Sequence, residues 1–167
     1  MPASDQGLQH KRYTVVPRTL IFLRRGDRVL LLRGAPHKRL WANRYNGLGG
    51  HVERGEDILS AAQRELREET GLEPPALQLS GVLAVDTGQD TGVVVFIFTG
   101  ELSGGEPLPS AEGTPEWLPV DALGDLPLVE DLPILLSHAL SQAPGDPPFF
   151  ARSFYDEQGK LQVVVGE

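Results

Sequence analysis

Apolar residues along this chain occur in short runs that are separated by polar and turn-forming segments. The first two runs cover residues 19–23 and 28–33, and the triplet Arg-Gly-Asp at 25–27 between them is typical of a hairpin turn. Within both runs the apolar residues are nearly continuous rather than alternating. Such continuity indicates burial on both faces, so we expect these runs to be central strands of a sheet.

Further strands are predicted in the second half of the chain. The runs at 77–86 and 92–102 are expected to be strands joined by a turn at 88–90, and the second contains the β-branched sequence VVVFIF. A short strand should open at Trp117, and the segments FFARSF and KLQVVV should form a hairpin near the end of the chain. Gly, Pro, Asn and Ser are concentrated between these elements, which predicts loops at 34–50, 103–115 and 142–148.

Two helices are predicted among these strands. The first should run from Asp57 to Thr70, because apolar residues recur there at helical spacing and Gly71 is a typical residue after a helix end. The second should cover 130–141, with Pro133 tolerated in its first turn. Strands interspersed with two helices predict a mixed α and β fold in which helices cover both faces of a sheet.

Length and composition are those of an ordinary globular protein. With 167 residues, 40% of them apolar and 23% charged, the chain is expected to form one domain at 13–167, preceded by a flexible polar tail at 1–12. That tail lacks the apolar core of a secretory signal, and no apolar run is long enough to cross a membrane. We therefore expect a cytoplasmic protein that does not associate with membranes.

The absence of cysteine and the excess of acidic residues exclude several classes of site. No disulfide, thiolate metal site or thiol nucleophile is available. The formal charge of −8 argues against nonspecific binding to long nucleic acid, because such binding depends on Lys and Arg contacts with phosphates. A small phosphorylated ligand that is bridged by a metal ion remains compatible with this charge.

Three glutamates stand out in the first predicted helix. Glu65, Glu68 and Glu69 are spaced so that their side chains share one helical face about one turn apart. Like charges placed in this way repel each other. The cluster is therefore either a well-solvated acidic face or a site for a hard divalent cation, since carboxylate oxygens are the ligands that Mg²⁺ and Mn²⁺ prefer.

Residues 50–72 place this helix in a longer motif. The sequence GHVERGEDILSAAQRELREETGL has a Gly-rich loop that leads into the helix, and its pattern is Gly, five residues, Glu, seven residues, then Arg-Glu-Leu-x-Glu-Glu-x-Gly-Leu. This segment resembles the Nudix box at every defining position. The resemblance implies an α/β/α sandwich, with a mixed β-sheet between helices, and an enzyme that hydrolyses phosphoanhydrides.

The Nudix resemblance also implies roles for particular residues. Glu65, Glu68, Glu69 and the carbonyl group of Gly50 would bind Mg²⁺, with Mn²⁺ as a possible substitute, and one of the glutamates would take a proton from the attacking water. Glu112 is similar to the acid that MutT-type members supply from a later loop. From the residues alone, Glu106, Glu112 and Glu116 could equally be solubilising charges.

Two more sets of residues are candidates around the box. Arg64 and Glu56 are expected to pair with each other and hold the loop against the helix. Asn46, Glu130 and Asp131 resemble the residues that face the purine in 8-oxo-dGTPases of the MutT class. The alternatives are structural, because Asn46 could be a turn residue and the two acids could cap the second helix.

The resemblance therefore implies a Mg²⁺-dependent pyrophosphohydrolase of a nucleoside triphosphate. An oxidised purine such as 8-oxo-dGTP is one candidate substrate, and the products would be the monophosphate and pyrophosphate. One alternative is a hydrolase of another nucleoside diphosphate derivative, such as ADP-ribose or a dinucleoside polyphosphate. Another is a non-catalytic nucleotide-binding or regulatory module. The only partner expected is a small nucleotide, and the sequence leaves open whether the protein is a monomer or a homodimer.

Overall fold

The computed structural model describes residues 3–7 and 12–166. Half of the expected flexible tail at 1–12 therefore lies outside the described residues. Its described part contains one short 3₁₀ helix, η1 (Ala3–Gln6). No helix in the described part of the chain is both long enough and apolar enough to cross a membrane.

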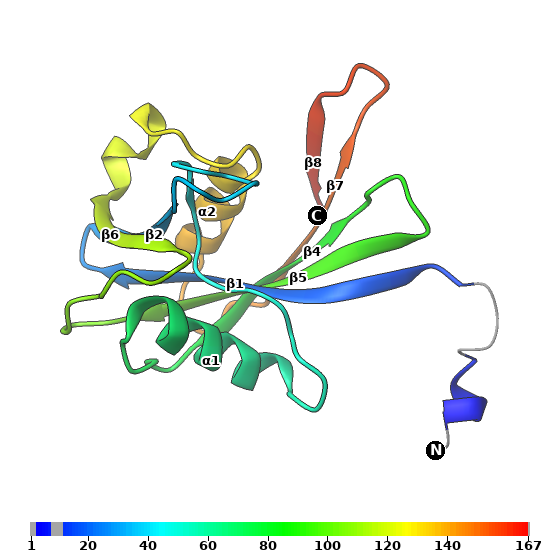
Figure 1. Cartoon of the computed structure of the whole chain (residues 1–167), viewed down its shortest axis with the longest axis horizontal. Helices are drawn as coiled ribbons and strands as arrows, with labels where there is room; N and C mark the ends of the chain where they lie inside the picture. The colour runs from blue at the N-terminus through cyan, green and yellow to red at the C-terminus, as the bar shows by residue number, and fades with distance from the viewer. Residues whose placement is uncertain (1–2, 8–11, 167) are drawn as a thin grey trace.

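An eight-stranded mixed sheet forms the centre of the molecule (Figure 1). Its order is β3-β2-β1-β5-β4-β7-β8, and β6 pairs with β2. The pairs β1–β5 and β4–β7 are parallel, whereas the remaining pairs are antiparallel. The strands are β1 (Thr14–Arg25), β2 (Arg28–Gly34), β3 (Tyr45–Asn46), β4 (Gln78–Val85), β5 (Thr91–Glu101), β6 (Gly113–Pro119), β7 (Phe149–Tyr155) and β8 (Leu161–Val165).

One helix packs on each face of this sheet. Along β1, Leu20 and Phe22 belong to the apolar core that includes residues of α2 (Leu132–Ser141). The alternate residues Ile21 and Leu23 belong to the core beneath α1 (Ile58–Thr70). Successive side chains of a strand point to opposite faces, so β1 contributes to both cores. This arrangement confirms the predicted α/β/α sandwich and the predicted burial of the first strands.

The ends of α1 are defined by local sequence. The Asp57 side chain accepts a hydrogen bond from the Ser60 amide at 2.9 Å, which satisfies one of the free N–H groups at the start of the helix. At the other end Gly71 adopts a left-handed conformation with φ of 70°, and its N–H donates to the Arg67 carbonyl. The helix boundaries therefore agree with the prediction to within one residue.

Three boundaries differ from the sequence prediction. Strand β1 begins at Thr14, five residues earlier than predicted, because its polar first half pairs with β5 from the Thr14–Thr91 pair onward. Strand β6 begins at Gly113 rather than Trp117, because it pairs along the whole of β2. Helix α2 begins at Leu132 rather than Glu130, after a 3₁₀ helix η2 (Val120–Asp125) that was not predicted.

Candidate active site

The three glutamates of α1 have very different environments. Glu69 is buried, with 5% of its surface exposed, and one carboxylate oxygen accepts the Gly49 amide at 2.7 Å. The side chain of Glu65 is 16% exposed, whereas that of Glu68 is 60% exposed. The helix therefore presents one buried, one half-buried and one exposed carboxylate at the loop that precedes it.

Burial raises the pKa of Glu69 from 4.5 to about 8. The Gly49 hydrogen bond and Lys38 act in the opposite direction, while the neighbouring charges of Glu65 and Glu112 raise the pKa further. A buried carboxyl group that is repelled by two other acids gains stability when a cation is added. This environment fits a divalent cation better than it fits a solvated acidic face.

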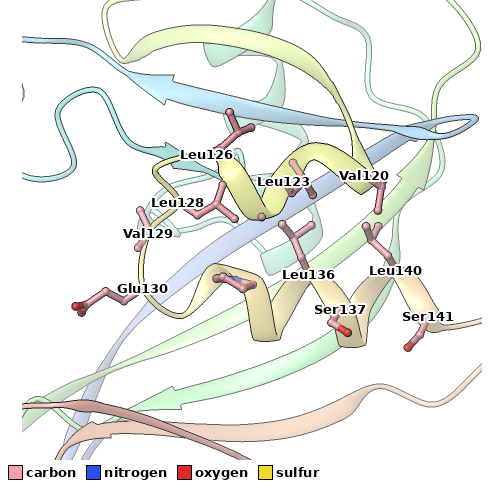
Figure 2. Close-up of a pocket in the computed structure, with 12 residues that line it drawn as sticks. Val120, Leu123, Leu126, Leu128, Val129, Glu130, Leu136, Ser137, Leu140 and Ser141 are labelled. Atoms are coloured by element: carbon pink, nitrogen blue, oxygen red, sulfur yellow. The ribbon is translucent and has the colours of Figure 1, made fainter.

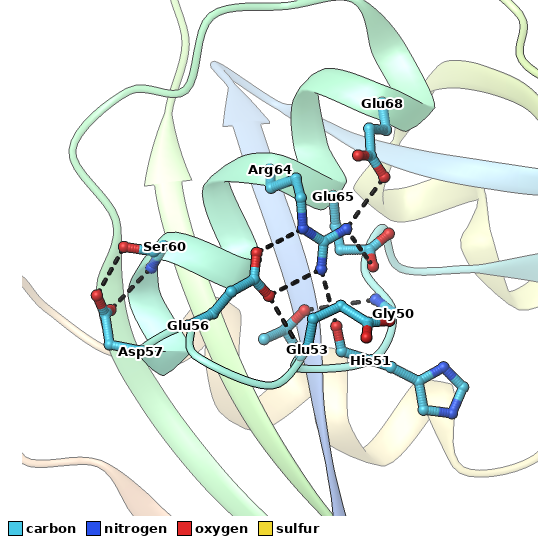
Figure 3. Close-up of polar contacts among 10 residues, drawn as sticks. Gly50, His51, Glu53, Glu56, Asp57, Ser60, Arg64, Glu65 and Glu68 are labelled. Atoms are coloured by element: carbon cyan, nitrogen blue, oxygen red, sulfur yellow. Dashed lines mark hydrogen bonds and ion pairs between the residues drawn. The ribbon is translucent and has the colours of Figure 1, made fainter.

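Arg64 connects the loop to the helix (Figure 3). Its Nε and Nη2 atoms donate to the two oxygens of Glu56 at 2.7 and 3.1 Å, and Nη2 also donates to the His51 carbonyl at 3.0 Å. Its Nη1 atom donates to Glu65 at 2.9 Å and to Glu68 at 3.0 Å. All five N–H groups of the guanidinium are thus used. Ion pairing with Glu56 and Glu65 raises the pKa of Arg64, and the same pairing lowers the pKa of Glu56.

This network confirms the predicted pairing between Arg64 and Glu56 and extends it. Arg64 also contacts two of the candidate metal ligands, so one guanidinium sets the positions of the loop and of Glu65 and Glu68. In the described part of the chain, no three His, Asp or Glu side chains are already grouped in a metal-binding arrangement. The candidate metal ligands near the loop are nevertheless carboxylate and carbonyl oxygens, which are the hard ligands that Mg²⁺ prefers.

Gly50 lies against the carboxylate of Glu65. Its carbonyl oxygen accepts the Thr19 amide at 2.8 Å, which attaches the loop to β1. A Cβ atom at this position would lie 2.5 Å from Glu65 Oε1 and 2.8 Å from Oε2. Only glycine therefore allows the loop backbone and this carboxylate to approach so closely.

Replacing Gly50 with alanine is expected to lower kcat by about tenfold or more, because the new methyl group displaces the Glu65 carboxylate. The unfolding free energy should change by less than about 1 kcal/mol, since the displaced group is the end of a flexible side chain. Gly104→Ala is the matched control, because a Cβ at Gly104 meets nothing within 4 Å. Steady-state kinetics and thermal denaturation would check this, and equal kcat values for both variants would contradict it.

The later acids separate into different roles. Glu106 forms an ion pair with Arg25, and Glu116 lies in β6 and accepts the Tyr45 hydroxyl at 2.9 Å. Glu112 lies immediately before β6, pairs with Lys38, and is close enough to Glu69 to raise its pKa. Of these three acids, Glu112 is the one that the fold brings to the α1 carboxylates.

A cleft of about 710 Å³ extends from this loop along the α2 face of the sheet. Its wall includes Gly49, Gly50, His51 and Glu112. It also includes the three residues that the sequence assigned to base recognition, which are Asn46, Glu130 and Asp131. The cleft therefore brings the Gly-rich loop and the candidate base-contacting residues into one space, whereas the three α1 glutamates are not among its lining residues.

Comparison with known families identifies this arrangement. The family model of the NUDIX domain matches residues 14–138, which include the loop, α1 and most of α2. The chain belongs to the NUDIX family. It is a Nudix hydrolase, and its reaction is the hydrolysis of a nucleotide pyrophosphate bond. Nudix hydrolases generally use divalent metals and bind small nucleotide substrates.

Individual relatives agree with this membership. The oxidized purine nucleoside triphosphate hydrolases of Danio rerio and Mus musculus are 37% and 36% identical to this chain over 106 residues. In each case the match covers 63% of this chain and 67% of the relative. A solved MutT protein from Bacillus halodurans is 26% identical, has a TM-score of 0.75, and matches over 90% of this chain and 97% of that one.

The structure bears on whether Asn46, Glu130 and Asp131 are base-contacting or structural residues. Asn46 Oδ1 accepts the Gly47 amide at 2.8 Å, so one atom of its side chain does serve the turn. Asp131 is the residue before α2, but its side chain makes no capping hydrogen bond. Burial raises the pKa of Asp131, and the nearby Glu130 charge adds to the effect. Asp131 therefore occupies the N-cap position without a side-chain capping bond, and it is also one of the residues that line the cleft.

The sequence did not assign most residues of the cleft wall to the site, including Arg18, Trp41, Ser153 and Tyr155. Arg18 comes from β1, Trp41 from the loop before β3, and Ser153 and Tyr155 from β7. Trp41 is 44% exposed, and its φ of 60° is unusual for a bulky residue. Tyr155 donates to Glu130 at 3.1 Å. Their positions depend on strand pairing over long sequence distances, which no local motif reports.

A second cavity of about 580 Å³ lies between η2 and α2 (Figure 2). Leu136 and Leu140 of α2 face Leu123 and Val120 across it. Most of its other walls are also apolar, and its lining includes neither the Gly-rich loop nor Glu112, although Glu130 borders both cavities. This cavity therefore lies outside the catalytic chemistry of the Nudix site.

Proposed function

We propose that this Nudix hydrolase is a Mg²⁺-dependent pyrophosphohydrolase of purine nucleoside triphosphates, with oxidised purines such as 8-oxo-dGTP as preferred substrates. The products would be the nucleoside monophosphate and pyrophosphate. The observation that carries the proposal is the single cleft that connects Gly50 and Glu112 with Asn46 and Asp131. The substrates named for the two vertebrate relatives support the same assignment.

The residues available for Mg²⁺ are Glu65, Glu68, Glu69 and the Gly50 carbonyl. The Gly50 oxygen already accepts the Thr19 amide, whereas the Gly49 carbonyl accepts no hydrogen bond from the described residues, so Gly49 is a second backbone candidate. When bound, Mg²⁺ would screen the charge of the polyphosphate and make the attacking water more acidic. The fit rests on the buried Glu69 carboxyl group and on the close approach of Gly50 to Glu65.

The chain's own groups would perform the remaining steps. Arg64 orients Glu65 and Glu68 through hydrogen bonds of 2.9 and 3.0 Å, and Glu56 holds Arg64 from the loop. Glu112, or one of the three α1 glutamates, would take the proton from the attacking water. The ion pair of Glu112 with Lys38 in the wall of the cleft that also includes Gly50 supports this role.

The side chains of Asn46, Glu130 and Asp131 suit the hydrogen-bonding edge of a modified purine. Asn46 keeps its amide N–H donors, because only Oδ1 is used by Gly47. Burial raises the pKa of Asp131, so this carboxyl group is easier to protonate than an exposed aspartate, and a protonated carboxyl can donate a hydrogen bond as well as accept one. Together with Glu130 these residues could pair with both donors and acceptors of an oxidised guanine.

The proposal also covers the setting in which the enzyme acts. We propose that residues 13–167 act as one Nudix hydrolase domain in the cytoplasm. Its ligand would be a free nucleotide, because a chain with a net charge of −8 has little affinity for long nucleic acid. ADP-ribose and dinucleoside polyphosphates are the competing substrates.

A substrate panel with product identification tests this proposal. We expect kcat/KM for 8-oxo-dGTP to exceed that for ADP-ribose and for dinucleoside polyphosphates, with Mg²⁺ required for turnover. Asp131→Asn should raise KM for 8-oxo-dGTP by about tenfold and leave its kcat nearly unchanged, because only the contact with the base is altered. A preference for ADP-ribose, or an Asp131→Asn variant with unchanged selectivity, would overturn the substrate assignment.

A further inference from the structure

Arg18 differs from the other arginine and lysine side chains of the cleft wall. Lys38 pairs with Glu112, and Arg44 donates to the Leu128 carbonyl at 3.4 Å. Arg18 forms neither an ion pair nor a side-chain hydrogen bond with any described residue, and its Nε atom is buried without a partner. The cleft therefore contains a guanidinium group whose hydrogen-bonding capacity is unused.

Strand geometry directs Arg18 into the cleft next to the catalytic loop. Residues 18, 20 and 22 alternate along β1, and Leu20 and Phe22 both belong to the α2-side core. Arg18 also lines the cleft on that face, and it forms an isolated bridge with His51. The next residue of β1 donates its amide to the Gly50 carbonyl. The guanidinium group thus extends from a backbone position beside the loop that carries the proposed metal ligands.

A partly buried guanidinium without an anionic partner is energetically unfavourable in the free protein. Its five N–H donors form a planar fork that matches the oxygens of a phosphate group. The whole chain carries a formal net charge of −8, so an approaching polyphosphate needs positive charge at the point of contact. Arg18, which has no ion-pair partner among the described residues, supplies this positive charge.

We propose that Arg18 binds a phosphate group of the nucleotide and so positions the polyphosphate between the base and the α1 glutamates. This inference rests on the proposed function, because it assumes that the cleft holds a nucleotide. The phosphate, rather than the base, is the expected partner because the backbone of Arg18 pairs with His51, the residue after the proposed metal ligand Gly50. Arg18 is thus a binding and positioning residue and takes no part in proton transfer.

Binding of inorganic tripolyphosphate, measured by isothermal titration calorimetry without metal and at low ionic strength, tests this assignment. Tripolyphosphate has no base, so the result is independent of which nucleotide the enzyme prefers. Arg18→Met should weaken binding by about tenfold or more, because the charge and all five donors are lost. Arg18→Lys, which keeps the charge but not the fork, should show an intermediate loss. With a hydrolysed nucleotide, Arg18→Met should raise KM more than it lowers kcat.

Arg24→Met is the matched control. Arg24 lies on the same strand and the same side of it, about 20 Å away, and it does not line the cleft. Its Nε atom is also buried without a hydrogen-bond partner, but unlike Arg18 it forms an ion pair, with Glu101 at 3.9 Å. Its loss should leave tripolyphosphate affinity within about twofold of the wild type. Arg18→Gln serves as a second neutral variant if the methionine variant does not fold. Wild-type affinity in the Arg18 variants, an equal loss in Arg24→Met, or no tripolyphosphate binding by the wild type would overturn the proposal.

Discussion

Replacing Glu69 with glutamine is expected to lower kcat by at least about 100-fold while raising the melting temperature of the metal-free protein. Glutamine is nearly isosteric, and its amide oxygen can still accept the Gly49 amide that now bonds to Glu69 at 2.7 Å. It cannot supply the negative charge that a divalent cation requires. The variant therefore removes a proposed metal ligand and, in the same step, a buried acid that is repelled by Glu65 and Glu112.

The gain in stability should depend on pH in a defined direction. Burial raises the pKa of Glu69 from 4.5 in its reference state to about 8. A carboxyl group whose folded-state pKa lies above its unfolded value contributes fully below the unfolded pKa, and the contribution is lost as pH rises towards the folded pKa. Wild-type stability should therefore fall relative to the glutamine variant between pH 4.5 and about 8. The difference at pH 7 is up to about 3 kcal/mol.

Thermal denaturation across this pH range, with and without Mg²⁺, measures both effects. Mg²⁺ should raise the melting temperature of the wild type and have little effect on the Glu69→Gln variant. Glu73→Gln is the control, because Glu73 is exposed and forms only an exposed ion pair with Arg67. A Glu69→Gln variant with wild-type turnover would show that Glu69 is not a metal ligand. A pH-independent stability difference would show that Glu69 is not a buried titrating group.

Replacing Arg64 with lysine is expected to lower the unfolding free energy by about 2–4 kcal/mol and kcat by about 10- to 100-fold. Lysine keeps the positive charge but has three donors on one nitrogen, so it cannot bond to Glu56, Glu65, Glu68 and the His51 carbonyl together. The loop and the α1 carboxylates would then lose their common anchor.

Arg67→Lys provides the comparison for this variant. Arg67 lies three residues further along α1, its side chain is 49% exposed, and its one ion pair is with the exposed Glu73. Such a pair contributes about 0–1 kcal/mol, so this substitution should change stability and turnover little. Denaturant unfolding and steady-state kinetics of both variants decide the matter. Similar losses for the two would contradict the central position assigned to Arg64.

Local patterns in the sequence were sufficient to predict much of the fold. The continuous apolar runs at 19–23 and 28–33 predicted strands buried on both faces, and the structure shows these residues divided between the α1-side and α2-side cores. The helical spacing of apolar residues and Gly71 predicted α1 to within one residue. Boundaries that depend on a distant partner were less accurate. The early start of β1 and the early start of β6 come from pairing with β5 and β2.

The sequence by itself determined which residues form the Nudix loop and helix, because spacing along one helix places the side chains of Glu65, Glu68 and Glu69 on a common face. It also determined that Arg64 of the helix would pair with Glu56 of the loop just before it, which is a contact within one short segment of the chain. These features depend on short-range geometry, which the order of residues specifies.

Only the tertiary structure decided how those residues differ and what surrounds them. Burial of Glu69 against Gly49 distinguishes it from the exposed Glu68, although both occur in one continuous motif. The cleft whose wall includes both Arg18 of β1 and Tyr155 of β7 is formed by strands far apart in the sequence. Desolvation and cleft shape arise from contacts among distant segments, so no local spacing of residue types could specify them.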